Sequence, residues 1–238
     1  MPIDKRAANA AEALADVADG ATVFISGFGG AGFPNVLIRA LRDRGPKDLT
    51  LVVNSATHRY SHTHELIEAG LVRKVVCTAA RGHSKEPSAF ERLWMDGKIE
   101  LECVPQGTFT ERIRAGGAGI PAFFTPTGAG TVVSEGKEIR EFDGRPYVME
   151  RGLKADFALI KAWKADRWGN LIFHKTARNF NPVMATAARV TIAEVEEIVE
   201  PGQLDPDGVH LASVYVKRIV LSTGQQKRIE KHTVRKRA

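Results

Sequence analysis

The chain has 238 residues, of which 43% are hydrophobic and 26% are charged, a balance that is ordinary for a globular protein with a substantial core. No apolar run approaches the roughly 20 residues that a membrane helix needs, and the first residues lack the pattern of a signal peptide. Cys77 and Cys103 fall in apolar, strand-like runs, which favours free buried thiols over a disulfide framework or a metal site. We therefore expect a cytoplasmic protein.

The net charge of +6 is concentrated near the end of the chain. Residues 221–238 carry six Lys or Arg and one Glu, so the rest of the chain is close to neutral. No aromatic residue interleaves with these basic residues, and no nucleic-acid recognition motif accompanies them. We expect a domain over residues 1–220, and a basic tail over 221–238 that is solvated or contacts a partner chain rather than nucleic acid.

Short apolar runs alternate with helical patterns through the first half of the chain. Ala7, Ala11, Leu14 and Ala18 recur at helical spacing and predict an opening helix. Strands are then predicted after Gly20 and over 49–53, 72–77 and 99–104, with helices over 34–44 and around 66–69 and 89–94. This alternation predicts a parallel sheet covered on both faces, with ligands at the carboxyl ends of its strands.

The character of the sequence changes from Gly116, where glycine-rich loops begin. Two extended runs, 138–141 and 145–150, flank Asp143-Gly144, a pair that supplies the positive φ of a two-residue hairpin turn. Later strands are predicted over 155–163, 190–199 and 214–221. The fold class is thus α/β, an open, mostly parallel sheet with helices on both faces and an inserted β-hairpin lobe.

A glycine-rich loop joins the first strand to the helix that Pro34 opens. Glycine lets backbone amides approach a phosphate or carbonyl closely, and a helix N-terminus adds partial positive charge. We do not assign the loop to the dinucleotide fingerprint, and no Lys followed by Ser or Thr makes it a P-loop. A tight turn without a ligand is the alternative. The candidate binding residues are Ser26, Gly27, Phe28, Gly29, Gly30, Ala31 and Gly32.

Three histidines, His58, His62 and His64, lie close together after the strand over 49–53. They suggest a metal site or a catalytic base, but we expect the adjacent Glu65 to point elsewhere and leave a zinc set incomplete. The alternative is a polar connection with His62 or Thr63 near a helix cap.

Gln106 lies just after a predicted strand, separated from it by Pro105. It is either an ordinary strand-end residue or a donor to a developing oxyanion. The polar segments 166–170 and 175–181 are either solvated loops or contacts for an anionic ligand. No nucleophile with a recognisable motif is present.

A linked series of motifs resembles the A (alpha) subunit of the family I coenzyme A transferases, the group that includes succinyl-CoA:3-ketoacid and 3-oxoadipate CoA-transferases. Its signature corresponds to residues 19–34, with Ser26 where a glycine is usual, so a backbone that needs positive φ there would be strained. The likeness continues through residues 72–76, 104–107, 111–119, 124–128, 155–162, 175–182 and 196–200, and covers nearly the whole chain.

The resemblance implies a partner B (beta) subunit, in a heterodimer or heterotetramer, whose glutamate is the nucleophile. It implies no permanently bound cofactor and no metal; a coenzyme A thioester is the substrate. The loop from Ser26 to Gly32 would then bind CoA, and Gln106 would be the oxyanion donor in a pocket at the interface between the two chains. The donor would be succinyl-CoA.

We favour 3-oxoadipate over acetoacetate as the acceptor, from the likeness of residues 72–77 and 166–171. The segment 57–86 departs from both patterns and would shape a different acid pocket. Part of a CoA-ester hydrolase on the same scaffold and a non-catalytic ligand-binding module remain alternatives.

Overall fold

The computed structural model describes residues 3–57, 61–82 and 84–223. Within them, one sheet has eight strands in the order β11-β10-β8-β1-β2-β3-β4, with β9 pairing antiparallel to β8 and all other pairs parallel. The strands are β1 (Thr22–Ile25), β2 (Leu49–Val53), β3 (Val72–Cys77), β4 (Glu100–Cys103), β8 (Ala155–Asp166), β9 (Leu171–Ile172), β10 (Ala188–Val199) and β11 (Arg218–Leu221). The predicted open, mostly parallel sheet is confirmed.

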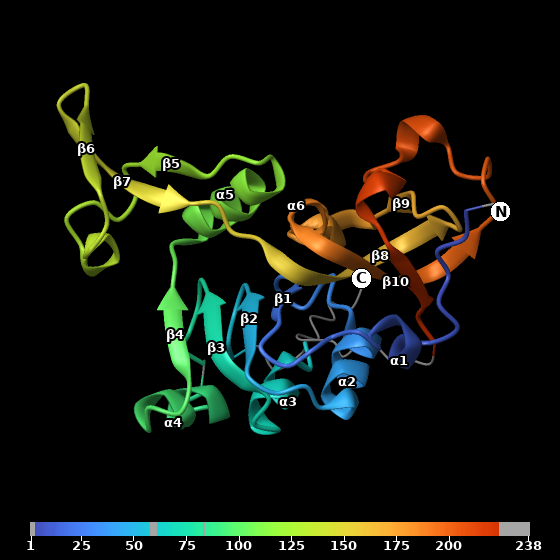
Figure 1. Ribbon diagram of the computed structural model, residues 1–238, viewed down its shortest axis with the longest axis horizontal. Helices are drawn as coiled ribbons and strands as arrows, with labels where there is room; N and C mark the ends of the chain where they lie inside the picture. The colour runs from blue at the N-terminus through green and yellow to red at the C-terminus, as the bar shows by residue number, and fades with distance from the viewer. Residues whose placement is uncertain (1–2, 58–60, 83, 224–238) are drawn as a thin grey trace, which may run out of the picture.

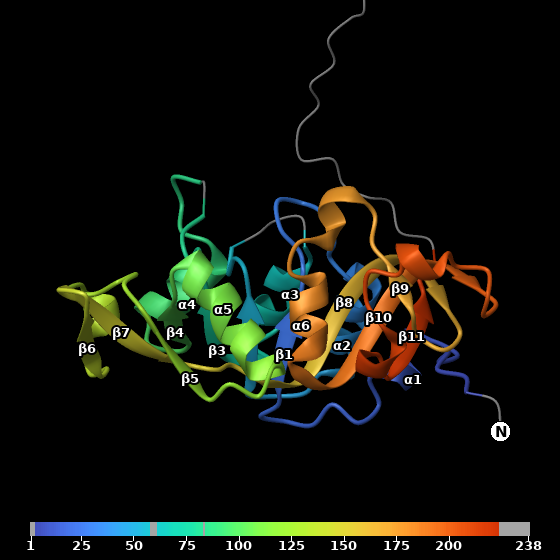
Figure 2. The same ribbon diagram turned by 90° about the horizontal axis from the view of Figure 1, so that it is seen from above.

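Helices cover both faces of this sheet, as Figures 1 and 2 show. Side chains alternate between the faces of a strand, so Val23 and Ile25 enter one core cluster while Phe24 enters the other. The first cluster packs under α1 (Ala10–Ala13), α2 (Asn35–Arg44), α3 (Thr63–Glu68) and α4 (Ala89–Met95); the second packs under α5 (Gln106–Gly117) and α6 (Asn181–Thr186).

The hairpin lobe projects from one end of the sheet (Figure 1). It is a three-stranded antiparallel sheet of order β5-β7-β6, with β5 (Ala122–Thr125), β6 (Ile139–Phe142) and β7 (Arg145–Arg151). Asp143 and Gly144 have φ of 49° and 73°, so the predicted two-residue turn is confirmed. Gly116 at the end of α5 lies so close to the lobe's return segment that an added Cβ would be 2.1 Å from the Leu153 carbonyl oxygen.

Two predicted elements differ from the structure, and one helix was not predicted. The opening helix is one turn long, Ala10–Ala13, because the Asn9 side chain caps it and the chain then continues in tighter turns. Residues 213–215 form a 3-10 turn, so the last strand begins at Arg218. Residues 106–117 form helix α5, which our sequence analysis did not predict.

The two long strands β8 and β10 extend past their shorter neighbour. They pair with each other from Ala155 to Asp166, whereas β1 pairs with β8 only as far as Leu159. Ser222 lies just after β11, and its hydroxyl donates a hydrogen bond to the Glu194 carboxylate on β10. The predicted basic tail lies outside the described residues beyond Thr223 and stays a prediction. No helix in the described part of the chain is long and apolar enough to span a membrane.

The two cysteines are neighbours on β3 and β4 but differ in access to solvent. Cys77 is buried and Cys103, expected to be buried, is exposed because β4 is the edge strand. Burial, with a smaller contribution from Cys103, raises the pKa of the Cys77 thiol to about 12. Since the thiolate is the reactive form, we expect iodoacetamide at about pH 8 to alkylate Cys103 in the folded protein and Cys77 only after unfolding. Mass spectrometry of the Cys103→Ser variant checks this, and rapid native labelling of that variant would contradict it.

Candidate functional site

The glycine loop after β1 is built around a very small hairpin. Phe28 and Ala31 exchange backbone hydrogen bonds of 3.0 and 2.9 Å, and the two residues between them, Gly29 and Gly30, have φ of 56° and 82°. Positive φ at both central residues is the geometry of a type I′ turn, which favours glycine. The amides of Gly29 and Gly30 have no hydrogen-bond partner among residues 3–57, 61–82 and 84–223. They are therefore free to donate to a ligand.

The glycines on either side of this turn allow close packing. At Gly27, with φ of 119°, a Cβ would lie 2.4 Å from the Phe33 ring. At Gly32, with φ of 77°, it would lie 2.7 Å from Asn181 Nδ2 and 2.8 Å from the Ala177 carbonyl oxygen. Both positions combine a left-handed backbone with a crowded surrounding, so any larger side chain would move the turn.

Ser26 fits its position without backbone strain. It is not among the residues with positive φ, so the strain considered above for a serine here does not arise. Its side chain is fully buried, and its hydroxyl donates a hydrogen bond of 2.5 Å to Asn181 Oδ1.

A buried carboxylate occupies the start of α2. Glu194 on β10 accepts hydrogen bonds from the amides of Val36 and Leu37, at 2.8 and 3.3 Å. Pro34 is the N-cap and α2 begins at Asn35, one residue later than predicted. The partial positive charge expected to attract a ligand is thus already compensated by Glu194, and the free amides of the turn remain as the donors of the loop.

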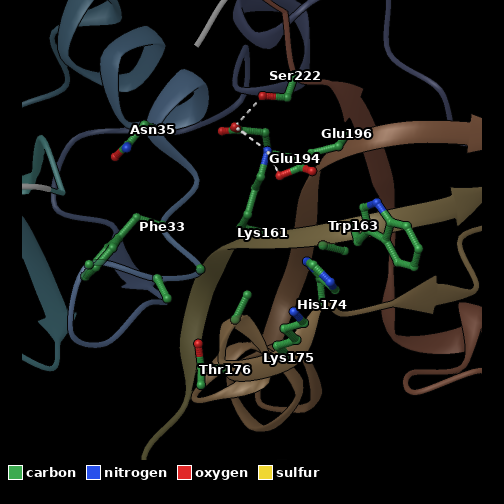
Figure 3. Close-up of a pocket in the computed structure, with 15 residues that line it drawn as sticks. Phe33, Asn35, Lys161, Trp163, His174, Lys175, Thr176, Glu194, Glu196 and Ser222 are labelled. Atoms are coloured by element: carbon green, nitrogen blue, oxygen red, sulfur yellow. Dashed lines mark hydrogen bonds and ion pairs between the residues drawn. The ribbon is translucent and has the colours of Figure 1, made fainter. Parts of the chain in front are cut away.

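A cavity of about 740 Å³ adjoins the turn. In Figure 3, Lys161 of β8 points to Glu194, and His174, Lys175 and Trp163 surround the opposite part of the cavity. Its wall is formed by residues 30–33, 161–163 and 174–177, with Asn35, Glu194, Glu196 and Ser222. Of the two polar segments singled out in the sequence, 175–181 therefore contributes to the cavity. In 166–170, the Asp166 carboxylate instead binds the amides of its own turn.

The structure does not bring Gln106 into this cavity. Gln106 is exposed and is the first residue of α5, at the carboxyl end of β4, while the glycine turn follows β1; β2 and β3 lie between them. A row of aromatic rings connects the two places: Phe109 contacts Phe180 at 5.6 Å, and Phe180 contacts Phe28 at 6.3 Å between centroids. Gln106 and the glycine turn thus both lie at the carboxyl ends of the parallel strands, but in separate places on the surface.

Two of the three histidines can be placed; His58 lies outside the described residues. His62 is the N-cap residue of α3 by position, as one alternative predicted, with φ of 49°. The expectation for Glu65 was wrong: its Oε1 lies 2.5 Å from His62 Nδ1, and it also pairs with Arg42. Despite partial burial, which raises it, the pKa of Glu65 is lowered by His62, Arg42 and Arg39. Over residues 3–57, 61–82 and 84–223, no group of three His, Cys, Asp or Glu side chains is arranged to hold a metal ion.

Gly27, Gly29 and Gly32 do have the G-x-G-x-x-G spacing of a dinucleotide fingerprint. The glycine spacing alone therefore does not exclude a dinucleotide site. The fingerprint also requires an acidic residue about 20 residues later, at the end of the next strand. Here Asn54 follows β2 and accepts a hydrogen bond from Thr78. The absence of that acid argues against a dinucleotide.

The sequence is similar to a known family over nearly its full length. The profile of the coenzyme A transferase family matches residues 7–222. The A chain of the succinyl-CoA:3-ketoacid coenzyme A transferase of Xanthomonas campestris pv. campestris (strain B100) is 55% identical over 232 residues, 97% of this chain and 94% of that protein. The corresponding chain of the 3-oxoadipate CoA-transferase of Pseudomonas putida is 50% identical over 222 residues, 93% of this chain and 95% of that protein.

Solved structures show the same fold. An acyl-CoA transferase apoenzyme from Escherichia coli O157:H7 superposes with a TM-score of 0.82 at 23% identity, over 95% of this chain and 48% of that one. The chain thus spans about half the length of that protein. The glutaconate coenzyme A-transferase of Acidaminococcus fermentans gives 0.77 at 20% identity, over 90% and 74% of the two chains. The predicted fold and enzyme class are confirmed: this chain belongs to the coenzyme A transferase family.

Proposed function

We propose that this chain is the alpha subunit of a transferase that moves CoA from succinyl-CoA to a 3-oxo acid such as 3-oxoadipate. The observation that carries the proposal is the match along more than nine-tenths of two relatives named as the corresponding subunits of such enzymes. The unpaired amides of Gly29 and Gly30 support it, because they can donate hydrogen bonds to a CoA thioester.

The nucleophile is proposed to be a glutamate of a partner beta subunit, so the chemistry is divided between two chains. The glutamate attacks the thioester carbonyl, forming an acyl–glutamyl anhydride and releasing CoA thiolate. The thiolate attacks the glutamyl carbonyl, giving a glutamyl-CoA thioester and the free donor acid. The acceptor carboxylate repeats these two steps in reverse order and leaves as its CoA ester, which returns the glutamate to its starting state.

Each attack places negative charge on a carbonyl oxygen, and this chain would supply hydrogen-bond donors to it. Gln106 fits this role because it is exposed and lies in the first turn of α5. This turn is at the carboxyl ends of the parallel strands, as is the glycine turn. A beta subunit that covers the carboxyl ends of the strands would enclose Gln106 and the glycine turn within one site.

The two-chain requirement is tested with the purified chain alone and after co-expression with its beta subunit. We expect CoA transfer from succinyl-CoA to 3-oxoadipate only in the second case. Turnover by the single chain would contradict the proposal, and CoA release without any acid acceptor would show a hydrolase instead. Comparing kcat/KM for 3-oxoadipate and acetoacetate decides the acceptor, for which the 3-ketoacid relative at 55% identity favours testing both.

We expect Gln106→Ala in the assembled enzyme to lower kcat by about 10²–10³, the usual effect of removing one oxyanion donor. Gln203→Ala is the matched control, because Gln203 is an exposed glutamine in the turn after β10. Steady-state kinetics of both variants checks the role. A kcat for Gln106→Ala equal to that of the control would remove Gln106 from the mechanism.

A further inference from the structure

One buried side chain joins the two ends of the glycine loop to β8 and to the segment before α6. Asn181, the first residue of α6, is fully buried. Its Oδ1 accepts hydrogen bonds from the Ser26 hydroxyl at 2.5 Å and from the Lys161 amide at 2.7 Å. Its Nδ2 donates to the carbonyl oxygens of Gly32 at 3.2 Å and Ala177 at 2.6 Å.

These four contacts use the full hydrogen-bonding capacity of an asparagine side chain, two donors and two acceptor positions. The Ser26 hydroxyl also lies 3.2 Å from the Gly32 carbonyl oxygen. Ser26 and Gly32 are the first and last residues of the loop, so one buried group holds both of its ends. Because water cannot reach this place, a group that lost its partner would stay unsatisfied.

A second contact holds the loop from the same side. Asn179 Nδ2 donates to the Ala31 carbonyl oxygen at 3.1 Å, on the residue that closes the Phe28–Ala31 hairpin. The carbonyl groups of Ala31 and Gly32 therefore bind Asn179, before α6, and Asn181, its first residue. Within the described part of the chain, the amides of Gly29 and Gly30 at the tip remain unbonded. The loop is anchored through its carbonyls and presents its amides.

We infer that Ser26 is a positioning residue, whose hydroxyl, through Asn181, fixes the turn with its free amides in place for the acyl-CoA. Ser26 does not itself touch the substrate, since it is fully buried. The inference rests on the proposed function for its kinetic consequence, but the anchoring of the turn can be measured without any substrate.

Ser26→Ala removes the hydroxyl and leaves Asn181 Oδ1 with the Lys161 amide alone. The matched control is Thr191→Val: Thr191 is also buried and its hydroxyl donates to the Ala185 carbonyl at the end of α6, away from the loop. In the assembled enzyme, we expect Ser26→Ala to raise KM for succinyl-CoA about tenfold, with kcat within about twofold and KM for the acid unchanged. Thr191→Val should leave all three constants unchanged.

Amide hydrogen exchange of the peptide covering residues 27–33 gives the independent reading. We expect exchange about tenfold faster in Ser26→Ala than in the wild-type or Thr191→Val protein. Unchanged exchange, or equal acceleration in the control, would overturn the inference whatever the enzyme's substrate. Faster exchange in an enzyme that transfers no CoA would uphold the anchoring and reject the proposed function instead.

Asn181→Asp serves if Ser26→Ala does not fold. It keeps an acceptor for Ser26 and Lys161 but replaces the amide that donates to Gly32 and Ala177. The same acceleration of exchange is expected, and protection equal to wild type would count against the inference.

Discussion

Replacing Glu194 by alanine is expected to destabilise the protein by about 3–5 kcal/mol, the usual cost of removing one partner from a buried ion pair. Glu194 is 1% exposed. Its carboxylate accepts hydrogen bonds from Lys161 Nζ at 3.1 Å and from the Ser222 hydroxyl at 2.8 Å, besides those from the two amides of α2. The alanine variant would leave those amides without their cap, a loss worth about 1 kcal/mol by itself.

Urea unfolding of Glu194→Ala beside Glu197→Ala measures this effect. Glu197 lies on the same strand and pairs with Lys164 at 2.8 Å. Because Glu197 is exposed and Lys164 is only partly buried, this pair is expected to contribute only about 0–1 kcal/mol. Glu194→Gln should fall between the two, since it keeps an acceptor for the α2 amides. Equal unfolding free energies for Glu194→Ala and Glu197→Ala would refute this role of Glu194.

Arg112→Ala is expected to loosen the hairpin lobe and to cost about 3–5 kcal/mol, again by leaving a buried charge short of its partner. The Arg112 side chain is 12% exposed, and it bonds Glu102 of β4 at 2.6 Å and lies 3.8 Å from Glu150 of β7. It also donates to the Arg151 carbonyl oxygen. Glu150, which is buried, would keep only the Lys137 contact at 2.6 Å among the described residues.

Limited proteolysis within residues 118–152, together with urea unfolding, reports on the lobe. Arg114→Ala is the matched control on the same helix, because Arg114 pairs with Glu111 on the surface. Resistance to proteolysis equal to that of the control would show that the ion pairs do not hold the lobe.

The same network predicts how stability changes in acid. Partial burial raises the pKa of Glu102, but hydrogen bonds and charges from Lys74 and Arg112 outweigh it and hold that pKa below its ordinary value. A carboxyl whose folded pKa is lowered stabilises the fold above its unfolded pKa, and this contribution is lost as pH falls through the folded value. The difference in unfolding free energy between wild type and Arg112→Ala should therefore shrink below about pH 4.5. A difference that stays constant between neutral and acidic pH would argue against it.

The parts of the fold that the sequence predicts best are those with a local signal. The buried strands β2 and β3 are short apolar runs and match the prediction residue for residue. Helix α5 gave no such signal, because Phe109 and Ile113 are its only large buried apolar residues and glycines lie near both ends. What makes it a helix is tertiary packing on α6 and on the lobe.

In the candidate site, too, only the features with a local signal in the sequence can be predicted. The residues of the glycine turn themselves predict its place, but Asn181 lies 155 residues from Ser26, whose hydroxyl it binds, and Glu194 lies 158 residues from Val36, whose amide it binds at the start of α2. No spacing rule connects them. Likewise, the contact between His62 and Glu65 depends on the helix start that brings their side chains together, rather than on adjacency in sequence.

The unequal lengths of β1 and β8 explain why the Asn181 side chain can bind the main chain of β8. On the side of β8 that faces β1, pairing with β1 ends at Leu159 and pairing with β9 begins only at Lys164. In the gap between them, the Lys161 amide donates to the Asn181 side-chain oxygen, where a longer β1 would offer a main-chain carbonyl. Asn181 is thus a one-residue substitute for a missing piece of sheet. Extending β1 by two residues would displace it and fill the hollow beside the turn, so the room for a ligand is set by where one strand stops.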